Sequence, residues 1–163
     1  MKHSAGILLF RRRAGRVEAL LAHPGGPFWR KRDLRAWSIP KGEYDPDTES
    51  ARDAARRELQ EETGIVEGEL LELGSFAQPS GKLVAAFALE GDFDPAGLRS
   101  NLCRIEWPPR SGRFADIPEV DRVQWFGMEE ARARIVRGQV AILRALIEKI
   151  GEADQTSGLL RPN

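Results

Sequence analysis

The most distinctive pattern in this chain lies between Gly42 and Ile65, where the sequence reads GEYDPDTESARDAARRELQEETGI. Its residues 45–48, DPDT, carry helix start signals, and Gly64 carries a stop signal. Residues spaced by three or four positions fall on one face of a helix. Those that share this spacing are Ala51, Ala54, Ala55, Glu58, Glu61, Glu62 and Ile65. One helix face therefore begins with small alanines, which permit close packing, and continues as three carboxylates.

Three carboxylates on a packed helix face need a counter-charge. Like charges at helical spacing destabilise an isolated helix, and buried carboxylates are costly without partners. A hard divalent cation such as Mg²⁺ or Mn²⁺ offsets the repulsion of all three at once. The opposite, polar face is formed by other residues, namely Arg52, Arg56, Gln60 and Thr63. We therefore favour a metal site and retain a solvated acidic cluster as the alternative.

The net charge of zero hides an uneven distribution of charge along the chain. Residues 1–41 carry ten Lys or Arg against two Asp or Glu, whereas residues 42–65 carry eight Asp or Glu against three Arg. A basic segment next to an acidic one suits a phosphate ligand held between cationic side chains and carboxylate-bound metal ions. Two solvated charge runs are the simpler alternative.

Several other functional classes have little support in the sequence. Only two histidines are present, which argues against a zinc site, and the single cysteine, Cys103, is read as a core thiol. A P-loop and a G-x-G-x-x-G motif are both absent from the sequence, which argues against a kinase and a dinucleotide-dependent oxidoreductase. No apolar run is long enough to span a membrane and no signal peptide is expected, so we expect a cytoplasmic protein with no membrane partner.

The length of 163 residues fits one compact domain, which we expect over residues 1–150, followed by a flexible tail over residues 151–163. Apolar runs and turn signals predict strands near residues 3–10, 17–22, 37–39, 70–77, 83–89, 102–107 and 122–126. Besides the acidic helix, helices are predicted near residues 128–136 and 139–150. Strands interleaved with few helices predict an α+β fold, arranged as an α/β/α sandwich with a mixed sheet.

The acidic segment resembles the Nudix box of the Nudix hydrolases, whose pattern is G-x5-E-x7-R-E-U-x-E-E-x-G-U, with U aliphatic. From Glu49 to Ile65 the match is complete. Six residues rather than five separate Gly42 from Glu49, and the insertion falls in the loop before the helix, where added length costs little. Two further stretches, WSIPKGE at residues 37–43 and EVDRVQWFGMEEA at residues 119–131, are similar to diadenosine tetraphosphate hydrolases of the family.

This resemblance implies a Nudix-type α/β/α fold and metal-dependent hydrolysis of a nucleoside diphosphate linked to another group. Carried over by position, Glu58 and Glu62 are expected metal ligands. Glu61 is expected to be a ligand or to orient and deprotonate the attacking water. Arg57 is expected to pair with Glu49 and hold the loop before the helix.

Residues outside the acidic helix complete the expected site. In the family the carbonyl of the box glycine, here Gly42, often joins the metal shell, although the inserted residue affects its position. Lys41 is expected to contact a phosphate, with a solvated lysine as the alternative. The family often supplies an additional Glu from a later loop or strand, and both Glu106 and Glu119 are candidates. We favour Glu119 as a general base or extra metal ligand, because its spacing to Trp125 matches and loops commonly carry catalytic groups.

Aromatic and basic residues before the box are candidate contacts to the substrate. Trp29 and Trp37 can stack on a base, and Arg30, in a basic run beside Trp29, can meet a polyphosphate. The alternatives are core packing for each Trp and a solvated loop for Arg30.

The function we favour is that of a Mg²⁺- or Mn²⁺-dependent pyrophosphohydrolase whose substrate is a dinucleoside polyphosphate. One alternative is a house-cleaning hydrolase of oxidised or non-canonical nucleoside triphosphates. Another is a non-catalytic nucleotide-binding module of the same fold, which we expect to show a damaged box. The expected partner is a small nucleotide rather than a nucleic acid, and a homodimer is compatible with the sequence.

Overall fold

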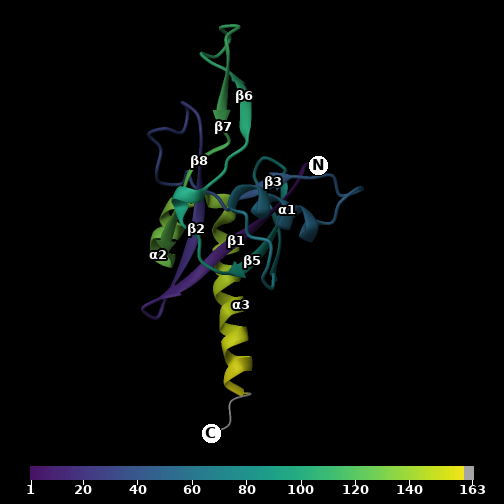
Figure 1. The fold of residues 1–163 in the computed structure, drawn as a ribbon, viewed down its shortest axis with the longest axis vertical. Coiled ribbons are helices and arrows are strands. Elements are labelled where there is room, and N and C mark those ends of the chain that lie inside the picture. Colours follow the sequence, from purple (N-terminus) through teal and green to yellow (C-terminus); the bar gives the residue numbers. More distant parts are fainter. Residues whose placement is uncertain (160–163) are drawn as a thin grey trace.

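The computed structural model describes residues 1–159 (Figure 1). Its central strand, β1 (His3–Arg13), is buried over seven consecutive positions. Continuous burial of this kind is typical of a strand covered on both faces. Alternate side chains of β1 contribute to two separate cores, with Leu8 and Phe10 in one and Ile7 and Leu9 in the other. Strand β1 therefore lies between two layers of the molecule.

The sheet around β1 has the order β4-β5-β1-β2-β8, and a short strand, β3, also pairs with β1. These strands are β2 (Arg16–Pro24), β3 (Lys41–Glu43), β4 (Leu71–Ala77), β5 (Leu83–Glu90) and β8 (Val120–Gly127). Strands β1 and β5 are parallel, whereas the other pairs are antiparallel. The predicted mixed sheet is therefore confirmed.

Helices cover both faces of the sheet. Helix α1 (Ala51–Thr63) packs its residues Ala54, Ala55 and Leu59 into the core that contains Ile7 and Leu9. Helices α2 (Met128–Arg134) and α3 (Val140–Leu159) contribute to the opposite core, which contains Leu8 and Phe10. This arrangement confirms the α+β class and the α/β/α sandwich.

A second, two-stranded sheet is formed by β6 (Leu102–Glu106) and β7 (Phe114–Pro118). Figure 1 shows this β6–β7 hairpin projecting from the body at the end opposite to the C-terminal half of α3. Two short 3₁₀ helices, η1 (Pro95–Gly97) and η2 (Arg137–Gln139), complete the regular structure. In the part of the chain that the structure describes, no helix is long and apolar enough to cross a membrane.

The start of α1 differs from the expectation. The helix begins at Ala51 rather than near Pro46, and the Ser50 hydroxyl accepts a hydrogen bond of 3.1 Å from the Asp53 amide as its N-cap. The Asp45 side chain instead accepts a hydrogen bond of 2.9 Å from the Asp47 amide. Asp and Ser both favour turns and caps because their side chains bind nearby backbone amides, and here the Asp forms a turn before the helix.

Four other elements differ from the expectation. Strands β3 and β7 were not predicted, and the strand expected over residues 37–39 is reduced to isolated bridges. Helix α3 continues to Leu159, so the tail expected to be flexible from Gly151 is helical over most of its length. The remainder of that tail, residues 160–163, lies outside the described residues, and the domain boundary at residue 150 stays a prediction.

Candidate active site

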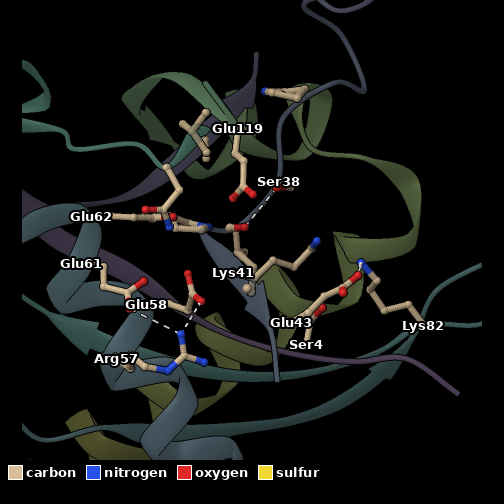
Figure 2. A pocket seen from close by; sticks show the side chains of 17 residues that line it. Ser4, Ser38, Lys41, Glu43, Arg57, Glu58, Glu61, Glu62, Lys82 and Glu119 are labelled. Atoms are coloured by element: carbon tan, nitrogen blue, oxygen red, sulfur yellow. Dashed lines mark hydrogen bonds and ion pairs between the residues drawn. The ribbon is translucent and has the colours of Figure 1, made fainter. Parts of the chain in front are cut away.

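Charged side chains from four parts of the chain line one cavity of about 610 Å³ (Figure 2). They are Lys41, Glu43, Arg57, Glu58, Glu61, Glu62, Lys82 and Glu119. Strand β3 supplies the first two, α1 the next four, and the last two come from the approach to β5 and the junction of β7 with β8. The structure thus brings together all the candidate residues from the box and two charged residues distant from it.

Helix α1 turns two of its three glutamates toward the packed side. Glu58 is 8% exposed and Glu62 is 5% exposed, as the continuation of the alanine face predicts. The Glu61 side chain is 42% exposed, and Leu59 occupies the core instead. The acidic row therefore runs along the border between the core and the cavity rather than wholly inside the packed face.

Arg57 organises the acidic helix from its edge. Its guanidinium donates two hydrogen bonds of 3.0 Å to the Glu49 carboxylate, which is the pairing that the box predicts. It also donates to Glu58 at 3.0 Å and forms an ion pair with Glu61 at 3.5 Å. Arg57 is therefore a positioning residue that fixes two cavity carboxylates as well as the loop before α1.

Glu62 has no such cation. Among the described residues, its carboxylate forms no ion pair or hydrogen bond with the protein. Burial, followed by the negative charges of Glu58, Glu119 and Glu61, raises the pKa of Glu62 from its ordinary 4.5 to about 8. Burial and Glu61 likewise raise the pKa of Glu58, against the opposing effect of Arg57. The cavity therefore holds more negative charge than its protein partners neutralise.

This excess of carboxylates fits a divalent cation by its chemistry. Oxygen ligands in a charged cluster are those that Mg²⁺ and Mn²⁺ prefer. Within residues 1–159, no three acidic, cysteine or histidine side chains converge closely enough to hold a metal ion as they stand. Arg57 draws Glu58 and Glu61 to one side, so binding a cation requires these side chains to rotate toward Glu62.

Gly42 allows Glu58 to lie against strand β3. A methyl group added at Gly42 would overlap the Glu58 carboxylate. Gly42 itself is held in place, because β3 pairs with β1 and sets Gly42 opposite Ala5. A side chain at this position would therefore displace a cavity carboxylate.

We expect Gly42→Ala to lower kcat/KM by roughly ten- to a hundredfold, because a displacement of Glu58 by about 1 Å disturbs the geometry of the whole acidic row. Steady-state hydrolysis and a thermal melt check this expectation. Gly91→Ala is the matched control, since a methyl group there makes only an ordinary contact of 3.5 Å with Leu9. Normal turnover by Gly42→Ala would contradict the argument.

The two candidate carboxylates outside the box are clearly separated by the structure. Glu119 lies at the single-residue junction between β7 and β8, and its side chain points into the cavity in Figure 2. Its amide donates to the Asn101 carbonyl at 2.8 Å, and its carbonyl accepts from Gly25 at 3.1 Å. Glu106 lies exposed on the β6–β7 hairpin and does not line the cavity. The geometry therefore favours Glu119.

Two lysines form the basic part of the cavity. Burial, and then the nearby charge of Lys82, lower the pKa of Lys41. Lys82 was not singled out in the sequence, where it reads as an ordinary residue of the turn before β5. The parallel pairing of β5 with β1, which sets Leu83 opposite His3, carries Lys82 to the edge beside β3. Its ammonium lies 3.1 Å from the Glu43 carboxylate.

The structure places the two tryptophans predicted to contact the substrate in different surroundings. Trp37 is only 1% exposed and packs edge-on against Phe126, with ring centroids 4.9 Å apart, so the prediction that it stacks on a substrate base is wrong. It belongs to the core because its bridge to Ile135 ties it to the segment after α2. Trp29 is partly buried and lines two cavities adjoining the carboxylate cavity. Arg30 is exposed and does not line the carboxylate cavity.

Comparison with known proteins relates this chain to a protein family and to solved structures of similar fold. The NUDIX domain family model matches residues 1–146. No curated protein matches the chain. A mutT/nudix family protein from Listeria innocua is 21% identical with a TM-score of 0.64, and the match covers 95% of this chain and 97% of that one.

Two further solved structures have the same fold. A C. elegans Ap4A hydrolase in a binary complex is 20% identical with a TM-score of 0.61, over 91% of this chain and 98% of that one. The NUDIX domain of Shewanella oneidensis NrtR, complexed with ADP ribose, is 17% identical with a TM-score of 0.57, and the match covers 93% of this chain and 86% of that one. Such low identities establish the architecture alone. The family match over most of the chain identifies it as a member of the NUDIX domain family.

Proposed function

We propose that this chain is a Mg²⁺- or Mn²⁺-dependent hydrolase of dinucleoside polyphosphates. The main observation behind the proposal is a cavity that brings the α1 carboxylates together with two lysines. In Figure 2 the α1 glutamates lie on one side, Lys82 lies on the opposite side, and Lys41 lies between them. A polyphosphate chain with bound cations needs both kinds of group, because the carboxylates hold the cations and the lysines neutralise the remaining phosphate charge.

Each group has a separate task in the proposed reaction. Glu58 and Glu62 would hold the divalent cation, which when bound neutralises phosphate charge and polarises the phosphorus–oxygen bonds. Glu119 approaches from the β7–β8 junction, where it can accept a proton from the attacking water. Glu61, the most exposed glutamate of the row, serves as a further ligand or orients that water. Arg57 keeps Glu58 and Glu61 on the cavity side of α1.

The length of the substrate is supported by the surroundings of the cavity. Two adjoining cavities, of about 300 and 490 Å³, each share residues with the carboxylate cavity. A ligand with a charged centre and two organic ends suits such an arrangement better than a simple triphosphate does. The stretches WSIPKGE and EVDRVQWFGMEEA, which resemble diadenosine tetraphosphate hydrolases, supply Lys41, Gly42 and Glu119 to the site.

A hydrolysis screen tests this proposal. We expect diadenosine tetraphosphate to be cleaved to ATP and AMP with at least about a tenfold higher kcat/KM than any canonical triphosphate. The screen should include nucleotide sugars, ADP-ribose and oxidised triphosphates, each with millimolar Mg²⁺ or Mn²⁺ and with excess chelator. Activity that persists in chelator would contradict the metal requirement. An oxidised triphosphate that is preferred by about tenfold would move the protein to the house-cleaning class.

A further inference from the structure

The smaller adjoining cavity, of about 300 Å³, lies between the β6–β7 hairpin and the loop 24–29, and we refer to it as the hairpin cavity. It shares the lining residues Pro24 and Glu119 with the carboxylate cavity, so the two spaces adjoin at the proposed general base. A volume at the lower end of the range for ligand sites suits one ring system rather than a whole dinucleotide.

The hairpin turns its apolar face toward this cavity. Exposure alternates along β6, with Cys103 and Ile105 partly covered and their neighbours in the strand exposed. Ile117 of β7 pairs with Cys103 and lies on the same covered side. All three of these side chains line the hairpin cavity. A projecting ribbon thus presents apolar side chains to a cavity rather than to the main core.

The opposite wall is a loop whose backbone is fixed against the hairpin. A methyl group added at Gly25 would overlap the Pro118 carbonyl, so the two backbones touch as only glycine allows. The Gly25 amide also donates a hydrogen bond of 3.1 Å to the Glu119 carbonyl. The hairpin cavity is therefore built from two segments that meet at Glu119, which couples its shape to the position of that residue.

Aromatic side chains line the loop side of the hairpin cavity. Phe28 and Trp29 both line it, and Phe28 is 61% exposed. Trp107 of the hairpin, which lies outside the cavity lining, meets Phe28 edge-on at a ring-centroid distance of 5.3 Å and is itself 37% exposed. Exposed aromatic rings beside a polar site are typical of platforms on which a base stacks.

The chemistry of the lining assigns a ligand to this cavity. Among the described residues, Glu119 is its only charged side chain, and no amide or hydroxyl side chain lines it. By contrast, the third cavity, beyond Lys41, is lined by Lys82, Gln78 and Gln139 and suits the charged and hydroxylated parts of a nucleotide. We propose that the hairpin cavity binds one nucleobase of the substrate by stacking against Phe28 and Trp29. The attached phosphates pass Glu119 into the carboxylate cavity.

This assignment rests on the proposed function, since it requires a nucleotide substrate, and it specifies how that substrate is selected. Stacking without hydrogen bonds to the edge of the base recognises any base but requires that one be present. The dissociation constants of the enzyme for AMP and GMP should therefore lie within about fivefold of each other. Inorganic tripolyphosphate has no base, so the hairpin cavity should contribute nothing to its binding affinity.

Filling the hairpin cavity tests the assignment. Ile105→Trp should raise KM for diadenosine tetraphosphate and Kd for AMP by about tenfold or more, with kcat changed less than about threefold. Leu102→Trp makes the same kind of addition to the same strand on its outer side, where Leu102 is 66% exposed, and should change neither constant. Inhibition by inorganic tripolyphosphate should be equal in both variants and the unmodified chain.

Removing the stacking surface provides a second test that places no added bulk in the fold. Phe28→Ala should raise the same KM and Kd by roughly fivefold or more. Phe114→Ala is its matched control, because Phe114 is 54% exposed on the other strand of the hairpin and lies outside the cavity lining. AMP binding is measured by calorimetry, and a thermal melt confirms that each variant is folded.

The outcomes separate this inference from the proposed function. Unchanged KM and Kd in both Ile105→Trp and Phe28→Ala, with hydrolysis intact, would overturn the base site and leave the function standing. Absence of hydrolysis in the unmodified chain, with AMP binding weakened by the same two variants, would overturn the function and leave the base site standing. A base site would also be contradicted if the two variants weakened the binding of tripolyphosphate by the same factor as the binding of AMP, because tripolyphosphate has no ring to stack.

Discussion

Glu62→Gln is expected to lower kcat by about a hundredfold or more, since electrostatic stabilisation is commonly the largest part of catalysis. Glu62 is 5% exposed and has no cation of its own, so it has the strongest requirement for a bound divalent ion among the α1 glutamates. Steady-state rates across a Mg²⁺ titration measure the loss. The matched control is Glu67→Gln, an exposed position beyond the helix that should turn over normally.

The same substitution should stabilise the metal-free protein at alkaline pH. The pKa of Glu62 is raised to about 8 in the folded state, so the folded chain retains a proton that the unfolded chain releases above about 4.5. The contribution of Glu62 to the free energy of unfolding of the metal-free chain therefore falls as the pH rises from about 4.5 to about 8, and levels off above that. Glu62→Gln lacks this contribution and should be more stable by roughly 2 to 5 kcal/mol at pH 8 to 9.

Denaturant unfolding in excess chelator at pH 5 and pH 9 checks the sign. The two chains should differ least at pH 5 and most at pH 9. Adding Mg²⁺ at pH 9 should stabilise the chain that retains Glu62 more than the variant, because a cation that binds only the folded state stabilises it. Equal free energies of unfolding of the two chains at both pH values would show that burial of the Glu62 carboxylate does not destabilise the fold.

Glu119→Gln is expected to lower kcat by about ten- to a thousandfold while KM stays nearly unchanged, the pattern that follows the loss of a general base. Its carboxylate lines the cavity on the side formed by the β7–β8 junction, and its backbone is held by Asn101 and Gly25. The amide of Gln keeps the shape of the side chain but cannot accept the proton. Steady-state kinetics over a range of pH measure this effect.

Glu106→Gln is the control for this second experiment. Glu106 is exposed on the hairpin, where it accepts only a long hydrogen bond of 3.4 Å from the Gly112 amide. Its substitution should leave both kinetic constants unchanged. If Glu106→Gln were inactive and Glu119→Gln normal, the general base would have to be sought on the hairpin.

Local sequence determined the acidic helix and the class of fold. The spacing of Ala54, Ala55, Glu58 and Glu62 and the stop at Gly64 depend only on neighbours within a few turns, and all of these positions behave as predicted. The pairing of Arg57 with Glu49 also lies within one motif. The apolar run over residues 3–10 likewise predicts the strand that the structure shows as β1.

Contacts between segments far apart in the chain complete the site. Lys82 reaches the cavity through the parallel pairing of β5 with β1, and Trp37 is removed from it by a bridge to Ile135. Glu119 is distinguished from Glu106 because one lies at a strand junction facing α1 and the other on a projecting hairpin. Each outcome depends on contacts between residues far apart in the chain. Periodicity and composition carry no signal for such contacts, because they register only the neighbours of a residue along the sequence.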